Sequence, residues 1–124
     1  MQKVTTMDVE EAKLCPIRNV LDRVGDKWSL LVLSMLGDHA IRFMDLKRGI
    51  GDISQRVLTQ TLRNLEKDGY VHRTVYPEVP PKVEYTLTRM GESFLAQMVP
   101  VFEWAIKWNN EISAARENYS CMDD

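Results

Sequence analysis

The chain has 124 residues, a formal net charge of −2 at pH 7, and 44% hydrophobic and 27% charged residues, as expected for one ordinary globular domain. It lacks the roughly 18 consecutive apolar residues of a membrane-spanning helix, the features of a signal peptide, and the cysteine number and spacing of a disulfide scaffold or metal site. These observations favour a cytoplasmic protein with no metal, no cofactor and no membrane partner.

The N-terminal part of the chain is predicted to form two helices after a flexible arm at residues 1–13. Pro16 suits the first turn of a helix, because its fixed φ is helical and its missing N–H is not needed there. Apolar residues at helical spacing continue this helix to Gly25. Asp26 is a favourable N-cap for the second helix, which ends at Gly37.

The middle of the chain is predicted to form a short extended stretch at residues 39–41 and two more helices. The third helix covers residues 43–48, and the two closely spaced glycines of residues 49–53 indicate a turn. Ser54 then caps a fourth helix, Ser54–Lys67, and Gly69 suits the left-handed position after its end.

The C-terminal part is predicted to form a β-hairpin and a long helix. Residues 70–76 and 82–87 are rich in β-forming side chains, and the prolines of residues 77–81 form the tip between them. Thr88 caps the last helix, in which Pro100 should produce a kink. The predicted fold class is therefore mainly α with a small β-hairpin (α+β).

The outer face of the fourth helix is polar and carries no acidic residue before Glu66. On a helical wheel its leucines form the opposite, apolar stripe. Arginine, glutamine, threonine and serine can hydrogen-bond base edges and phosphates, and the N-terminal part of such a helix reaches the bases in a helix-turn-helix. Base contacts are expected from Ser54, Gln55, Arg56, Thr59 and Gln60, and backbone contacts from Arg63 and Lys67.

Positive charge is concentrated in the same part of the chain. Residues 42–89 contain nine basic and six acidic residues, a balance of +3, while the remainder carries −5. A hairpin that follows such a helix can lie beside the DNA groove as a wing, and the further candidates for DNA contacts are Arg42, Arg73 and Lys82. The alternative for the fourth helix is an ordinary solvated face of a small α+β domain.

An ordered set of motifs extends this interpretation. It consists of Cys15-Pro16, Gly25-Asp26-Lys27-Trp28, Arg42-Phe43-Met44-Asp45-Leu46, Gly51-Asp52-Ile53-Ser54, Leu58-Thr59-Gln60-Thr61-Leu62, Leu65-Glu66-Lys67-Asp68-Gly69-Tyr70-Val71, Arg73, Val83-Glu84-Tyr85-Thr86-Leu87-Thr88, Gly91 and Trp108. With these motifs the chain resembles the HxlR-type family of bacterial winged helix-turn-helix regulators, relatives of the MarR group. The resemblance covers residues 14–112, which we expect to form the domain, with residues 113–124 as a tail.

The resemblance implies a homodimer that binds a palindromic double-stranded DNA operator and represses or activates nearby genes. It places the dimer interface on the N- and C-terminal helices. The last helix agrees, because Trp104, Trp108 and Ile112 exceed the apolar residues that one small core needs. Packing of these residues within one chain is the alternative.

The resemblance also draws attention to Cys15, because some family members sense oxidants or electrophiles through a cysteine just before the first helix. The partial positive charge of a helix N-terminus lowers the pKa of a thiol and favours the reactive thiolate. The alternative is a small buried apolar residue, the common role of a free cysteine.

No nucleophile elbow, phosphate-binding loop or pair of catalytic carboxylates occurs in the sequence, so we expect that the protein is not an enzyme. The sequence leaves two alternatives to a plain DNA-binding regulator. One is a winged-helix module for protein–protein assembly, which the polar, cationic face of the fourth helix disfavours. The other is a regulator that responds to a small molecule bound in the apolar region near Trp104 and Trp108.

Overall fold

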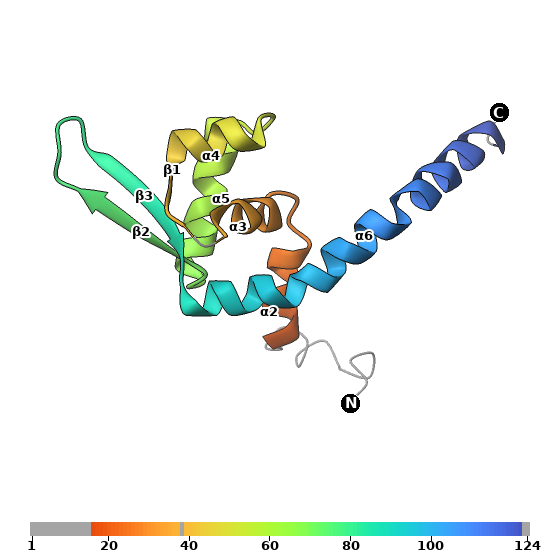
Figure 1. Cartoon of the computed structure of the whole chain (residues 1–124), viewed down its shortest axis with the longest axis horizontal. Coiled ribbons are helices and arrows are strands. Elements are labelled where there is room, and N and C mark those ends of the chain that lie inside the picture. The colour runs from red at the N-terminus through yellow and green to blue at the C-terminus, as the bar shows by residue number, and fades with distance from the viewer. Residues whose placement is uncertain (1–15, 38, 123–124) are drawn as a thin grey trace.

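The computed structural model describes residues 16–37 and 39–122 (Figure 1). Its helices and strands follow the predicted order. They are α2 (Pro16–Val24), α3 (Ser29–Leu36), β1 (Ile41–Arg42), α4 (Phe43–Ile50), α5 (Gln55–Lys67), β2 (Val71–Tyr76), β3 (Lys82–Leu87) and α6 (Arg89–Met122).

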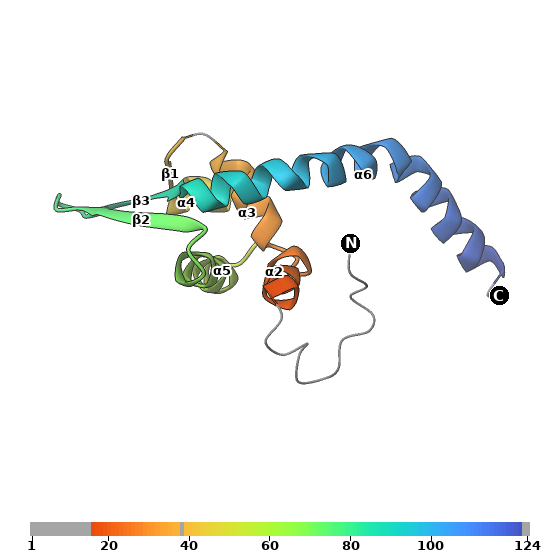
Figure 2. The same ribbon diagram turned by 90° about the horizontal axis from the view of Figure 1, so that it is seen from below.

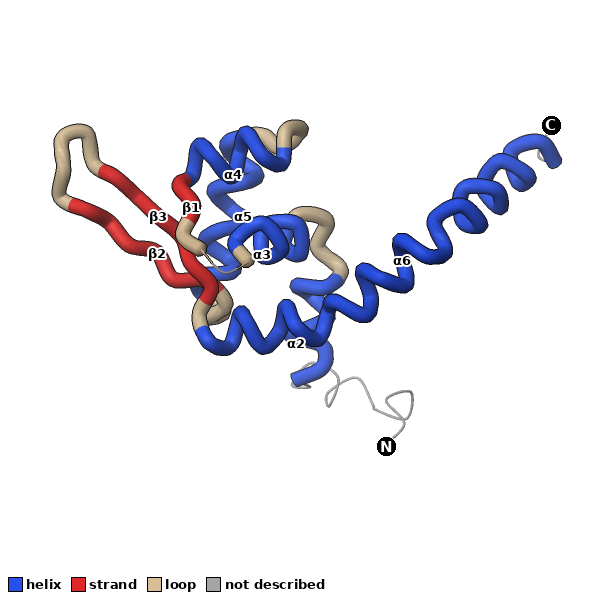
Figure 3. The backbone as a smooth tube through the Cα atoms, in the orientation of Figure 1, coloured by secondary structure: helices blue, strands red, loops and turns tan. Residues whose placement is uncertain are grey.

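The strands form one antiparallel sheet in the order β1-β3-β2. The hairpin of β2 and β3 pairs Val71 with Leu87 at its base and Tyr76 with Lys82 near its tip, and it extends away from the helices (Figure 3). The mainly α fold with a small hairpin is confirmed. The sheet adds a third strand, because β1 pairs with β3 at Ile41 and Tyr85.

The core is formed mainly by leucines from α3, α4 and α5, packed against the base of the sheet. Helix α3 has the sequence SLLVLSML and lies at the centre of the domain, between α4, α5 and the first part of α6. The buried apolar residues are Val32, Leu33, Leu36, Leu46, Ile53, Leu58, Leu62, Leu65, Tyr70, Val71 and Tyr85. This core fixes α5 against the sheet, so that one face of α5 remains exposed.

Several boundaries differ from those predicted. Helix α4 continues to Ile50, so Gly49 is helical and Gly51 alone has a positive φ, of 91°, in the turn. The short strand is residues 41–42 instead of 39–41. Helix α3 begins at Ser29, and Asp26 lies upstream of the N-cap, where its carboxylate accepts a hydrogen bond from the Ser29 hydroxyl.

Helix α6 is the longest element, with 34 residues, or about 51 Å at 1.5 Å per residue. Its first part packs on the domain, whereas its second part projects away and is not collinear with the first (Figures 1 and 2). Pro100 lies inside it and lacks an N–H for the helical ladder. Residues 113–122, which the sequence places in a tail, continue the helix.

Over residues 16–37 and 39–122, no helix combines the length and the apolar character that crossing a membrane requires.

Candidate nucleic-acid interface

Helix α5 presents the predicted polar face to solvent. It is capped by Ser54, whose hydroxyl accepts a hydrogen bond from the Val57 N–H at 3.1 Å. Leu58, Thr61, Leu62 and Leu65 are buried, which confirms the predicted apolar stripe. The side chains on the opposite side are exposed, and these include Gln55, Arg56, Gln60, Arg63 and Lys67.

A groove of about 490 Å³ separates this face of α5 from the sheet. Three predicted contact residues of α5, Gln55, Thr59 and Arg63, line one wall, and Arg73 of β2 lies on the other. The remaining lining residues, which were not predicted as part of the site, are Phe43, Glu66, Val83 and Tyr85. The fold therefore brings the polar flank of α5 and the base of the hairpin onto one surface.

Two polar side chains of α5 are held by neighbours on the same helix. The Thr59 hydroxyl donates to the Gln55 carbonyl at 2.8 Å. The Gln60 amide nitrogen Nε2 donates to Asn64 Oδ1 at 3.2 Å, which orients the amide group. Asn64 was not predicted to belong to the site, although its spacing of four residues from Gln60 is the spacing at which helical side chains meet.

The basic side chains predicted to contact DNA differ in whether a nearby acidic side chain offsets their charge. The Lys82 ammonium lies 3.0 Å from Glu84 Oε1 and 5.0 Å from the centre of the Tyr76 ring. Within the part of the chain that the structure describes, Arg73 makes no ion pair, and neither do Arg42, Arg56, Arg63 and Lys67. The unneutralised positive charge therefore lies on α5, on β1 and at the base of the hairpin, while the charge at Lys82 is partly offset.

The C-terminal end of α5 is fixed by contacts with the start of α6. The Thr88 hydroxyl donates to the Gly69 carbonyl at 2.6 Å and accepts from the Gly91 N–H at 3.0 Å, which confirms Thr88 as a cap. The Thr88 N–H donates to the Tyr70 carbonyl at 3.0 Å, and the Tyr70 ring packs on Phe94 with 5.0 Å between centroids. Burial, reinforced by the charge of Asp68, raises the pKa of Tyr70 above its ordinary value.

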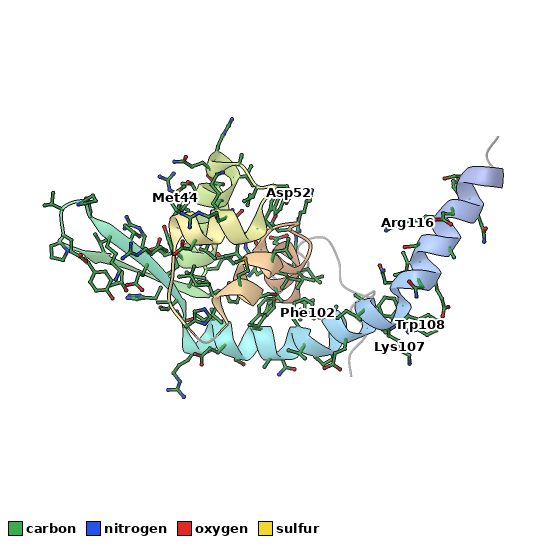
Figure 4. The ribbon with its side chains drawn as sticks, turned by 45° about the horizontal axis from the view of Figure 1, so that its top comes forward. Met44, Asp52, Phe102, Lys107, Trp108 and Arg116 are labelled. Atoms are coloured by element: carbon green, nitrogen blue, oxygen red, sulfur yellow. The ribbon has the colours of Figure 1, made fainter. Side chains whose placement is uncertain are left out.

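The residues predicted for a dimer interface lie on α6, beyond the body of the domain. Phe102 lies beside the other helices, whereas Trp108 and Arg116 lie progressively farther out (Figure 4). Trp104 is 57% exposed, and its ring centre is 6.3 Å from that of Trp108. Helix α2 also exposes apolar side chains, namely Ile17, Val20 and Leu21.

Cys15, the predicted redox residue, lies outside the described residues. Among the residues that are described, no group of three or more histidine, cysteine, aspartate or glutamate side chains is arranged to hold a metal ion.

A model of the HxlR-like helix-turn-helix family matches residues 23–113. The chain is 40% identical over 109 residues to an HTH-type transcriptional regulator of Methanothermobacter thermautotrophicus, an alignment that covers 88% of this chain and 80% of that protein. It is 41% identical over 106 residues to the HTH-type transcriptional regulator YtfH of Escherichia coli, with 86% and 84% covered.

Solved structures agree with these matches. The transcriptional regulator YtfH of Salmonella typhimurium superposes with a TM-score of 0.77 at 39% identity and covers 89% of this chain and 97% of its own. The redox regulator HypR in its reduced form gives a TM-score of 0.75 at 38% identity, with 80% and 98% covered. Diamide-treated YodB of Bacillus subtilis gives 0.65 at 35% identity, with 76% and 94% covered.

Proposed function

The chain is a winged helix-turn-helix transcriptional regulator that belongs to the HxlR-like helix-turn-helix family, and we propose that it acts by binding double-stranded DNA sequence-specifically as a homodimer. Helix α5 enters the major groove and the hairpin of β2 and β3 lies beside it as a wing. The operator is palindromic, because a two-fold symmetric dimer presents the same reading surface to each half-site.

The observation that carries the DNA-binding proposal is the surface shared by α5 and the base of the hairpin. Arg56, Gln60 and Gln55 are the side-chain types that pair with guanine and adenine edges, and they are exposed in the N-terminal half of α5. Arg63 and Arg73 face the groove between α5 and the sheet and suit backbone phosphates. An assembly surface would instead expose aliphatic or aromatic side chains on α5.

The dimer proposal depends on apolar side chains that one chain leaves exposed. A contiguous apolar surface of this kind usually marks a protein–protein contact. On α6, the exposed Trp104 and Trp108 share one face with the partly buried Ile112 at about 100° per residue, and a second copy of the chain is the partner that covers this face. Half-sites about 34 Å apart, one helical turn of DNA, are expected.

The direct test is selection of duplexes from a random library, followed by footprinting of the selected sequence and of the region upstream of the gene. A palindromic footprint whose affinity falls steeply with salt is expected, because binding releases counterions. Absence of duplex binding at low salt would contradict the proposal, and an affinity independent of salt would favour a protein partner.

Arg56→Ala is expected to lower discrimination at one base position by about 1–3 kcal/mol, because a bidentate contact to guanine is lost. The measurement is the affinity for the selected operator and for all single-base variants of one half-site. Arg18→Ala removes the same charge from α2, outside the polar face of α5, and should leave the base preference unchanged. Equal weakening on every sequence would instead assign Arg56 to the phosphate backbone.

Arg73→Ala is expected to weaken binding to all duplexes and to reduce the slope of log affinity against log salt by about 1, the value for one phosphate contact. Lys82→Ala should change the slope less, because Glu84 already offsets the Lys82 charge. Affinities between 50 and 200 mM salt distinguish the two variants. A larger loss for Lys82→Ala would mean that the Lys82–Glu84 pair opens on DNA.

Cys15 is the residue through which we propose that the protein responds to oxidants or electrophiles, and two of its structural neighbours support this: the redox regulator HypR and diamide-treated YodB. Diamide is expected to change operator affinity of the wild-type protein and of Cys121→Ser, but not of Cys15→Ser. Titration by fluorescence anisotropy measures the change. A normal response of Cys15→Ser would remove Cys15 from the mechanism and leave a small-molecule inducer as the alternative.

A further inference from the structure

An ion pair connects the end of α5 to the N-terminal helix. Arg23, in the last turn of α2, lies with its Nε atom 2.6 Å from Oδ2 of Asp68, the C-cap residue of α5. The two side chains are only 20% and 33% exposed, so solvent screens this pair less than a pair on the open surface. Figure 2 shows α2 and α5 next to one another.

This contact differs in kind from the other ion pairs of the described residues. Arg48–Asp45 lies within α4, and Lys82–Glu84 lies within β3, so each joins residues of a single element. Arg23 and Asp68 are 45 residues apart in the chain and join two helices. None of the side chains of α2 is fully buried, so core packing holds this helix less firmly than it holds α3 or α5.

The segment that ends α5, residues 68–70, also contacts the start of α6. Gly69 and Tyr70, which follow Asp68 directly, accept the hydrogen bonds of Thr88 at the start of α6. Both helices that we propose for the dimer interface, α2 and α6, are thus attached to the exit of α5, at residues 68–70. Helix α3 packs on α2, α5 and α6, and the polar contacts at residues 68–70 add direct links between the end of α5 and both of the other helices.

We infer that Arg23 and Asp68 are positioning residues that fix the angle of α5 relative to the dimer helices and thereby set the spacing between half-sites that the dimer accepts. The inference rests on the proposed function. Helix α5 has 13 residues and is about 20 Å long. A tilt of about 10° at its C-terminal end therefore moves its N-terminus by about 3.4 Å, the rise of one base pair.

The experiment measures binding to duplexes that carry two half-sites with the spacer shortened or lengthened by one base pair, and to a duplex with a single half-site. The proteins are wild type, Arg23→Ala, Asp68→Ala, the charge exchange Arg23→Asp with Asp68→Arg, and Arg18→Ala as a control on α2. Circular dichroism and light scattering establish that each variant is folded and dimeric.

Wild type and Arg18→Ala are expected to prefer one spacing. The two alanine variants should lose about three- to tenfold of that preference, as expected for a partly buried charge-assisted contact, with unchanged affinity for the single half-site. The charge exchange should restore part of the preference.

Folded, dimeric alanine variants that keep the wild-type spacing preference would overturn the inference and leave the proposed function intact. An equal loss of affinity on the single half-site would also overturn it, because the pair would then support α5 itself. If the wild-type protein bound no duplex at all, the proposed function and the inference would fail together.

Discussion

The double substitution Trp104→Glu with Trp108→Glu is expected to convert the proposed dimer into a monomer and to lower operator affinity by about 10²–10⁴-fold. Both side chains are exposed in the single chain, so their replacement removes no core packing. In a dimer each glutamate would bury an unpaired charge at the interface, which is strongly unfavourable. A monomer binds each half-site independently, so it loses the gain in affinity that a dimer obtains when its second half-site contact becomes intramolecular.

Light scattering and a gel shift on the full operator and on one half-site measure this effect. Affinity for the single half-site should stay near that of the wild type, since α5 and the wing are unaltered. Asn110→Glu provides the control, because it places the same charge on the opposite face of α6 at about 100° per residue. A variant that remains dimeric with wild-type affinity would place the interface elsewhere, and monomers from Asn110→Glu would place it on the other face.

The helices and the hairpin could be predicted because the residues that begin and end them, such as caps and left-handed glycines, can be recognised from the nearby sequence alone. Ser54 caps α5, Gly69 has a φ of 87° after its end, and Thr88 caps α6, each as expected from the residue type and its neighbours. The length of α6 was underestimated because residues 113–120 lack the apolar spacing of a packed helix. Residues 113–120 are all exposed, and Ile112 is the last partly buried side chain before them, so packing left no pattern to detect.

The candidate site could be predicted only in part, for a similar reason. The polar face of α5 follows from a helical wheel, but the groove that joins it to Arg73 depends on how the sheet packs. The pairing of Lys82 with Glu84 had a local signal, since residues two apart on a strand share a face. The contact of Arg23 with Asp68 had none, because nothing in either segment indicates a partner 45 residues away.

The protein thus consists of a DNA-reading surface, formed by α5 and the base of the hairpin, and of the helices that hold this surface in position. The reading surface consists of exposed side chains whose loss should change DNA binding and leave the fold intact. The segment at residues 68–70 belongs to the second group, because α5 ends there and α6 is attached to it by hydrogen bonds. Substitutions that displace the backbone of Gly69 or Tyr70 should therefore lower stability first and DNA binding as a consequence.

Gly91→Ala is expected to destabilise the folded protein by about 3 kcal/mol or more, at the upper end of the cost of inserting a methyl group into a packed site. A Cβ atom at Gly91 would lie 2.1 Å from the Tyr70 carbonyl oxygen and 3.1 Å from its carbonyl carbon. That carbonyl accepts the Thr88 N–H, so the backbone cannot move away without breaking the contact between α5 and α6. Urea unfolding followed by circular dichroism measures the loss.

Gly49→Ala is the matched control, because its Cβ would also meet an atom at 2.1 Å, in this case the terminal methyl of Met35. Methionine is flexible and can adopt another rotamer, and alanine is favoured over glycine inside a helix by up to about 1 kcal/mol. Gly49→Ala should therefore stay within about 1 kcal/mol of the wild type. A loss for Gly91→Ala as small as the one expected for Gly49→Ala would show that the backbone at Tyr70 moves as easily as a flexible side chain, and the junction could then not hold α5 at a fixed angle.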